Sequence, residues 1–319
     1  MRGQDGSNMN SAHPTSQIYQ TLAERLIGIL RASISLILMS VNTLVLCIPI
    51  YLIALLRAIS SDRLKPTWTE HAMSIAEHWI SFNNLVLDSF QRLDIQVVGL
   101  EELDQHAWYL VIANHQSWTD IMILQRVFNR RIPMLKFFIK QQLIYVPVIG
   151  IAWWVLDFPI MKRYSAAILK KKPHLRGKDL ETTRRSCERF KLTPVSVLNF
   201  LEGTRFSEQK KSSTHSPFQY LLKPKSGGAA MVLDALSERL DQIIDVTLVY
   251  EEKTPSFMEF LMGHKARIVV NVDTISVSEV KASTMDSEEN VNNRKTHAFL
   301  NERWLRKDRI IGELLEHQS

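Results

Sequence analysis

The longest apolar segment of the chain lies near its start. Residues from Ala32 to Leu56 include no charged side chain and are bounded by Arg31 and Arg57. As a helix, this segment would be roughly 37 Å long, enough to cross a hydrocarbon core of about 30 Å. It lies too deep in the chain, and lacks the small-residue exit, for a cleaved signal peptide. The pattern therefore predicts a retained membrane anchor, with a buried core helix as the alternative. Pro49 predicts a kink in it or a re-entrant pair of shorter helices.

Beyond this segment, short β-branched runs alternate with helical periodicity. The expected strands are Leu93–Val98, Trp108–Ala113, Val195–Phe200, Ile243–Tyr250 and Arg267–Val272. Helical patterns occupy 67–91, 118–129, 179–191, 226–241 and 294–315, and 279–293 is read as a polar surface loop. Such alternation is typical of an α/β domain with a mostly parallel central sheet flanked by helices. We expect a polar tail over residues 1–17, a membrane segment over 18–60 and one catalytic-sized domain over 61–319.

Composition excludes several classes of protein. Hydrophobic residues at 45% and charged residues at 23% are ordinary for a globular chain and exclude a disordered polymer. Only two cysteines occur, Cys47 and Cys187, in unlike surroundings, which excludes a disulfide scaffold and a Cys-rich zinc module. The net charge of +6 suits anionic partners such as phosphate substrates, CoA, acidic lipid or nucleic acid, and selects none of them.

Much of the positive charge is concentrated in one stretch. From Lys162 to Lys178 there are seven basic residues and no acidic one. The stretch is either a solvated loop or a contact for anionic headgroups, CoA phosphates or an acidic carrier protein. No aromatic-interleaved or helix-turn-helix pattern accompanies it, so we expect no nucleic acid partner.

Polar residues gather where the strand Trp108–Ala113 ends. Asn114 and His115 follow the strand, and Ser117 and Asp120 stand where the next helix should begin. A histidine beside a carboxylate can take a proton from an alcohol as that alcohol attacks a carbonyl carbon. The alternative is structural, because Ser117 and Asp120 also fit the capping box of a helix N-terminus.

A second polar loop follows the strand Val195–Phe200. It reads Glu202-Gly203-Thr204-Arg205. The planar donor fork of arginine suits phosphate oxygens, and a glycine allows close approach of the backbone. The alternative is an ordinary loop with a surface salt bridge between Glu202 and Arg205.

Taken together, the two loops resemble a known family. NH-x4-D at one strand end and EGTR at another, 87 residues later, resemble the motifs of the glycerolipid acyltransferases, the 1-acylglycerol-3-phosphate acyltransferases and their lysophospholipid relatives. The resemblance covers about residues 93–250. The fuller form NHQSWTD looks most like YihG-type bacterial inner-membrane acyltransferases and eukaryotic lysocardiolipin acyltransferases.

The resemblance implies a role for each motif residue. His115 would be the general base and Asp120 its partner, supported by Asn114 and Ser117. A second motif resembles residues Gly150–Arg163, and the third is Phe200–Arg205. The substrate phosphate would be bound by residues of these two motifs, namely Arg163, Glu202, Gly203, Thr204 and Arg205. Two positions depart from the pattern: Leu201 stands where many members have proline, and Asp245 where proline is usual in a fourth motif. No metal and no cofactor are implied beyond acyl-CoA or acyl-ACP as cosubstrate.

The function implied is that of a membrane-bound O-acyltransferase. It would transfer a fatty acyl group to the free hydroxyl of a lysophospholipid, with 1-acylglycerol-3-phosphate favoured as acceptor and phosphatidate as product. Its partners would be a membrane lipid, the acyl donor and an anionic membrane surface. Because acyl thioesters are cytosolic, we expect a bacterial inner membrane location with the domain facing the cytoplasm. The alternative is a non-catalytic lipid-binding or regulatory relative.

Other chemistry has little support in the sequence. Ser117 with His115 and Asp120 lacks the G-x-S-x-G elbow of a serine hydrolase. Cys187 could be an acyl-enzyme nucleophile, but no histidine lies near it in the sequence. Trp153 and Trp154 indicate core packing, a lipid-facing groove or an acyl-chain tunnel.

Overall fold

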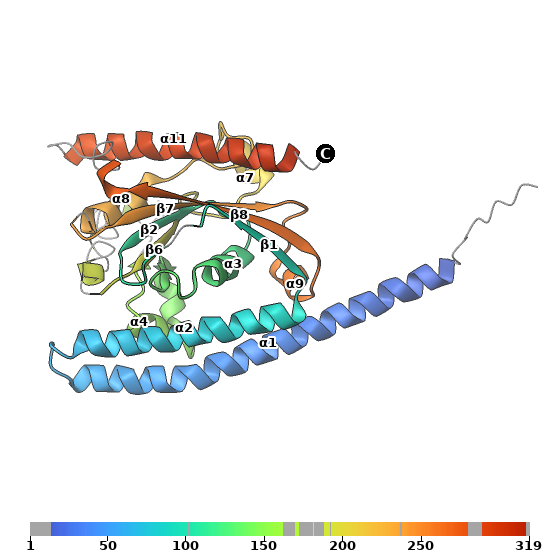
Figure 1. Cartoon of the computed structure of the whole chain (residues 1–319), viewed down its shortest axis with the longest axis horizontal. Helices are drawn as coiled ribbons and strands as arrows, with labels where there is room; N and C mark the ends of the chain where they lie inside the picture. Colours follow the sequence, from blue (N-terminus) through green and yellow to red (C-terminus); the bar gives the residue numbers. More distant parts are fainter. Residues whose placement is uncertain are drawn as a thin grey trace, which may run out of the picture.

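The computed structural model describes residues 14–100, 103–161, 170–171, 181, 188–191, 193–236, 238–279 and 289–316. Within these residues, a central sheet lies between helices, with α11 over one face and α3 over the other (Figure 1). Two long helices, α1 and α2, run side by side beyond α3 (Figure 1).

In this part of the chain, six strands form the main sheet, in the order β1-β8-β7-β2-β6-β3. They are β1 Leu93–Val98, β2 Tyr109–Ala113, β3 Leu135–Phe137, β6 Ser196–Phe200, β7 Gln242–Tyr250 and β8 Ala266–Ser276. Every neighbouring pair is parallel except β7 and β8. The mostly parallel sheet expected from the sequence is thus confirmed. Short strands that were not predicted are β3 and the separate pair β4 Ile139–Lys140 and β5 Ile160–Met161.

The helices frame this sheet. They are α1 Pro14–Ile59, α2 Lys65–Phe90, α3 Thr119–Phe128, α4 Ile149–Val155, α7 Glu208–Ser213, α8 Ser226–Ala235, α9 Phe257–Leu261 and α11 Glu289–Glu316, with 3-10 turns η1 Gln141–Tyr145 and η3 Arg189–Lys191. The predicted loop over 279–293 was wrong at its end, because α11 already begins at Glu289. The helix predicted over 226–241 ends at Ala235. Most of the helix predicted over 179–191 lies outside the described residues.

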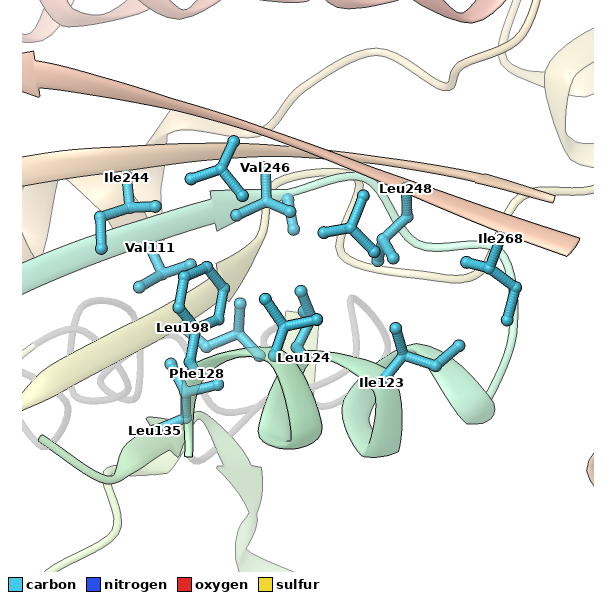
Figure 2. Packing of buried hydrophobic residues seen from close by; sticks show 14 of the residues in the cluster. Val111, Ile123, Leu124, Phe128, Leu135, Leu198, Ile244, Val246, Leu248 and Ile268 are labelled. Atoms are coloured by element: carbon cyan, nitrogen blue, oxygen red, sulfur yellow. The ribbon is translucent and has the colours of Figure 1, made fainter. Parts of the chain in front are cut away.

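The core fills both faces of the sheet. All five residues of β2 are buried, as expected for a parallel strand covered on both sides. On one face, Val111, Leu198 and Val246 pack against Leu124 and Phe128 of α3 (Figure 2). The opposite face packs against α8 and α11. This packing fixes the carboxyl ends of β2 and β6, where the two polar loops begin.

The helix α1 continues through Pro49 as one element. The helix is therefore not divided at this proline. Proline within a helix removes a backbone hydrogen bond and costs about 3 kcal/mol. Here Cys47, Ile50 and Ile53 are buried in a cluster formed with α2 and α4, and their burial offsets that cost.

Among the described helices, one is long and apolar enough to cross a membrane. It comprises Leu22–Ile59, whose most apolar window has a mean hydropathy of 2.3 and is mostly exposed. Large apolar side chains, including Ile37, Ile48 and Leu55, are more than half exposed on it. The alternative of a buried core helix is thus at odds with this exposure.

A buried ion pair joins α11 to the sheet. The ammonium group of Lys307 lies 2.6 Å from Oδ1 of Asp245, and Arg303 pairs with Oδ2 of the same carboxylate at 2.9 Å. Lys307 is 1% exposed and Asp245 is 5% exposed. Asp245 of β7 therefore attaches the C-terminal helix to the sheet.

Replacement of Lys307 by methionine should destabilise the fold by about 2–3 kcal/mol, because it leaves one oxygen of a buried carboxylate without its cation. Chemical denaturation of the purified protein in detergent measures this change. Arg306→Met, one residue earlier and half exposed, is the matched control and should cost much less. Equal effects of the two substitutions would contradict the assignment.

Candidate active site

The turn after β2 is fixed by Asn114. Its side-chain amide donates to the carbonyl of Leu248 at 2.8 Å and accepts from the amide of the same residue at 2.8 Å. An asparagine side chain can make this reciprocal pair because it carries a donor and an acceptor, as a peptide unit does. The chain thus leaves the sheet at a defined point, with His115 as the next residue.

His115 and Asp120 lie in contact. Nδ1 of His115 is 2.8 Å from Oδ2 of Asp120, which is completely buried in the first turn of α3. The same oxygen accepts from the backbone amides of Gln116 at 2.6 Å and Ser117 at 3.0 Å. The contact from the amide of Ser117 is one half of the expected capping box; the other half is missing between these two described residues, because the hydroxyl of Ser117 donates to the carbonyl of Pro255. The same carboxylate also contacts the imidazole. It holds the helix start and orients the imidazole.

The imidazole of His115 is held on its face as well as at its edge. It stacks on Phe200 with ring centroids 4.0 Å apart and an angle of 17° between the planes. Its side chain remains 14% exposed. If Nδ1 donates to the carboxylate, the neutral ring carries its free lone pair on Nε2. That nitrogen can then accept a proton from a substrate hydroxyl.

Ser117 and Tyr250 complete the support of this turn. The hydroxyl of Ser117 donates to the carbonyl of Pro255 at 2.9 Å, so it is engaged in a structural contact. The hydroxyl of Tyr250 donates to Oδ1 of Asp120. Burial raises the pKa of Tyr250 well above its ordinary value, which keeps the phenol protonated as a donor. Tyr250 was not singled out from the sequence as a site residue. Its position at the end of the predicted strand Ile243–Tyr250, like that of the residues after the other two strands, could have indicated it.

The carboxylate of Glu202 faces inward. Oε1 accepts from the amide of His115 at 2.8 Å and Oε2 accepts from the amide of Leu222 at 3.0 Å. Burial raises the pKa of Glu202 to about 7, against the two backbone hydrogen bonds, which lower it. The structure thus places Glu202 beneath the turn that carries His115. Glu202 and Arg205, which are both among the described residues, do not form the salt bridge that was the alternative for this loop.

The rest of the second loop lies at the surface. Gly203 has a φ of +67°, which favours glycine. The hydroxyl of Thr204 accepts from the ammonium group of Lys210 at 2.8 Å. Arg205 is exposed, and its guanidinium lies 5.0 Å above the ring of Trp118. Arginine and tryptophan from the two loops therefore stack across the site.

An apolar cavity of about 580 Å³ opens beside Trp118. It lies between α1, α2, α3 and α4, and Met39, Trp79 and Ala152 are among its lining residues. Trp153 also lines it, so the apolar pair singled out in the sequence faces this cavity in part. Trp118, which lines the cavity, follows His115 by three positions in the chain.

Some sequence predictions lie outside the described residues. These are Arg163, Cys187 and most of the basic stretch, of which Lys170 and Lys171 are described as exposed. In the part of the chain that the structure describes, no group of three or more His, Cys, Asp or Glu side chains could hold a metal ion.

Comparisons with known proteins identify similar chains. Residues 94–251 match the acyltransferase family model. The chain is 24% identical over 259 residues to mouse 1-acyl-sn-glycerol-3-phosphate acyltransferase epsilon, covering 74% of this chain and 66% of the relative. It is 26% identical over 192 residues to a probable 1-acyl-sn-glycerol-3-phosphate acyltransferase 5 of Arabidopsis thaliana, covering 56% and 48%. The chain thus spans about half to two thirds of these relatives.

A solved structure is also similar. It is the crystal structure of the 1-acyl-sn-glycerophosphate (LPA) acyltransferase PlsC from Thermotoga maritima, which is 14% identical. The match covers 82% of this chain and 95% of that chain, with a TM-score of 0.43.

The buried carboxyl of Glu202 should make stability depend on pH. Its pKa is raised from 4.5 to about 7 in the folded chain. The stability that it contributes is therefore fully present below about pH 4.5 and is lost as the pH rises through about 7. Relative to Glu202→Gln, which does not titrate, the unfolding free energy of the wild type should fall by on the order of 3 kcal/mol across this window.

Denaturation of both proteins across this pH range measures the effect. Glu208→Gln, at an exposed carboxyl in the same region, should follow the wild type at every pH. A constant difference between the wild type and Glu202→Gln would show that the group does not titrate in this window.

Proposed function

We propose that this chain, which belongs to the glycerolipid acyltransferase family, is a membrane-bound O-acyltransferase that acylates a lysophospholipid. The favoured acceptor is 1-acylglycerol-3-phosphate, which gives phosphatidate. The observation that carries the proposal is the contact of His115 with the buried Asp120, beside the loop that holds Arg205. Both relatives are named as 1-acyl-sn-glycerol-3-phosphate acyltransferases, which supports this choice of acceptor. The intact pair argues against the non-catalytic alternative.

The reaction is a direct transfer. Nε2 of His115 removes the proton of the acceptor hydroxyl as its oxygen attacks the thioester carbonyl. The carbon–sulfur bond then breaks, and the imidazolium returns the proton to the leaving thiolate. The buried carboxylate of Asp120 stabilises the imidazolium between these steps. General-base assistance of this kind contributes about 10²- to 10⁴-fold to the rate.

Arg205 is well placed to bind the acceptor phosphate. Its guanidinium stacks on Trp118 while remaining exposed, so its N–H groups can reach phosphate oxygens. Arg163, from the second motif, is proposed as its partner on the basis of the family pattern alone. Glu202 acts indirectly, because its oxygens hold the backbone of His115 and Leu222.

The apolar cavity is proposed as the site of the acyl chain. Its walls are mostly hydrocarbon and aromatic side chains, and they include Trp118, three positions after His115. An acyl group that enters beside Trp118 would bring its thioester carbonyl to the imidazole. Burying the chain away from water would favour its binding by about 0.8 kcal/mol for each methylene.

The helix α1 is proposed to attach the protein to a membrane side-on. Its apolar part, 38 residues, is about 57 Å long, roughly twice the thickness of a hydrocarbon core. Its C-terminal half also packs on α2 and α4, while the opposite face exposes large apolar side chains. One face in lipid and the other on the domain would place the cavity close to the bilayer. A cytosolic thioester, acyl-CoA or acyl-ACP, would then supply the acyl group.

Replacement of His115 by alanine should lower acyl transfer by about 10²- to 10⁴-fold, because the general base is lost. Transfer to lysolipids by purified protein, with acyl-CoA and acyl-ACP offered separately, measures this change. Membrane association should be unaffected. His78→Ala, at an exposed histidine on α2, is the matched control and should keep the wild-type rate. An unchanged rate in His115→Ala would remove the mechanism.

Narrowing the cavity should change the preferred acyl length. Ala152→Leu adds volume to the cavity wall, so kcat/KM for the longest donors should fall about 10-fold relative to shorter donors, the equivalent of about two excluded methylenes. A series of acyl donors measures the preference. Ala58→Leu, the same change at an exposed position of α1, should leave the preference unaltered. A uniform loss for all donors would place the acyl chain elsewhere.

A further inference from the structure

Two lysines to which the sequence analysis assigned no role, Lys210 and Lys225, lie against the Gly203–Arg205 loop. A β-carbon on Gly203 would lie 3.2 Å from Cδ of Lys225 and 3.3 Å from its ammonium nitrogen. The amide of Lys225 donates to the carbonyl of Leu201 at 2.7 Å, so the backbone of this lysine is fixed to the same loop. The side chain of Lys225 therefore lies beside the space that a side chain at position 203 would occupy.

Lys210 reaches the loop from α7. Its ammonium group donates to the hydroxyl of Thr204 and to the carbonyl of Arg205, both at 2.8 Å. The backbone of Arg205 is thus held from one side by Lys210, while its guanidinium is held over Trp118. Three cationic side chains from separate segments meet at one short loop.

These charges are not neutralised by the described acidic residues around them. Lys211, next to Lys210, pairs with Glu208 at 3.6 Å. Within the described residues, no ion pair is recorded for Lys210, Lys225 or Arg205. Glu202, three residues before Arg205, is turned inward onto backbone amides. Like charges at one loop repel each other, so an anion bound there would be stabilised.

The segment from Phe200 to Phe206, which includes this loop, contacts His115 at three places. Phe200 stacks on its ring, Glu202 accepts from its amide, and the amide of Phe206 donates to its carbonyl at 2.7 Å. The segment that carries Arg205 is therefore packed against His115. An acceptor whose phosphate binds to this loop can then present its free hydroxyl toward the imidazole.

We propose that Lys225 forms the acceptor phosphate site together with Arg205, and that Lys225 makes this site selective for a phosphate monoester over a diester. Lys210 is a positioning residue, which holds Thr204 and the backbone of Arg205. This inference rests on the proposed function, and it assigns the choice between acceptor lysophospholipids to Lys225 and Arg205.

The difference in charge between a phosphate monoester and a phosphate diester explains the proposed selectivity. A phosphate monoester carries a charge of about −1.5 to −2 near neutral pH and has three free oxygens. A diester carries one charge and has two free oxygens, with a second substituent in place of the third. A guanidinium fork can satisfy two oxygens, and an ammonium group beside it can bind the third.

Binding without turnover tests the proposal. The full chain with His115→Ala is titrated with lysophosphatidate, a monoester, and with lysophosphatidylglycerol, a diester, in the same detergent. Adding Lys225→Gln should weaken monoester binding by about 10- to 100-fold, the usual range for a lost hydrogen bond to a charged group. Diester binding should change by less than about 3-fold, since that ligand lacks the third oxygen.

Lys223→Gln is the matched control, because it removes the same charge two residues away from an exposed position. It should leave both affinities near their starting values. Equal weakening by Lys223→Gln and Lys225→Gln, or equal affinity of the starting protein for both lipids, would overturn the proposal.

The role of Lys210 is tested by turnover of the otherwise wild-type chain. Lys210→Gln should raise the KM for the monoester acceptor and leave the KM for the acyl donor unchanged, and Lys210→Arg should restore much of the loss. Lys211→Gln is the control at the neighbouring, paired lysine. A change confined to the donor KM would assign these lysines to the donor and overturn the inference.

The two proposals fail separately. If purified wild type transfers no acyl group, the proposed function fails, whereas monoester binding and its loss in Lys225→Gln still decide the phosphate site. If transfer proceeds normally in Lys225→Gln with an unchanged acceptor KM, the phosphate site fails and the proposed function stands.

Discussion

The carboxylate of Asp120 is the interaction on which the site depends. It is completely buried, and it accepts hydrogen bonds from the turn after β2, from the imidazole of His115 and from the hydroxyl of Tyr250. A buried charge is tolerated only when its oxygens are satisfied, and here the groups that satisfy it include those that the proposed chemistry needs in place. The same contacts therefore stabilise the turn and orient the proposed base.

Glu202 repeats this arrangement from the neighbouring strand. Its carboxyl group accepts hydrogen bonds from the backbone of His115 on one side and of Leu222 on the other, so the loop after β6 and the turn after β2 are joined as one unit. The surface of that unit is left free for cations, with Arg205 stacked on Trp118 and two lysines beside it. Buried carboxyl groups thus support the proposed base from inside, and the cations proposed to bind the acceptor phosphate lie at the surface.

Much of this arrangement was predictable from the sequence. The apolar run Tyr109–Ala113 determines a strand covered on both faces, and such strands end together at one edge of a parallel sheet. Polar residues that follow two of these strands, His115 and Arg205, were therefore expected to meet. The apolar segment before Arg57 was likewise evident from its length and lack of charge.

Other features were decided only by the tertiary structure, because they depend on contacts between residues far apart in the chain. The hydroxyl of Tyr250 reaches Asp120 across 130 positions, and the carboxylate of Glu202 turns to backbone amides and not to the arginine three residues away. The continuity of α1 through Pro49 depends on packing against α2 and α4, which local propensity does not contain. Sequence determined which chemical groups stand at the strand ends; packing decided which of them touch.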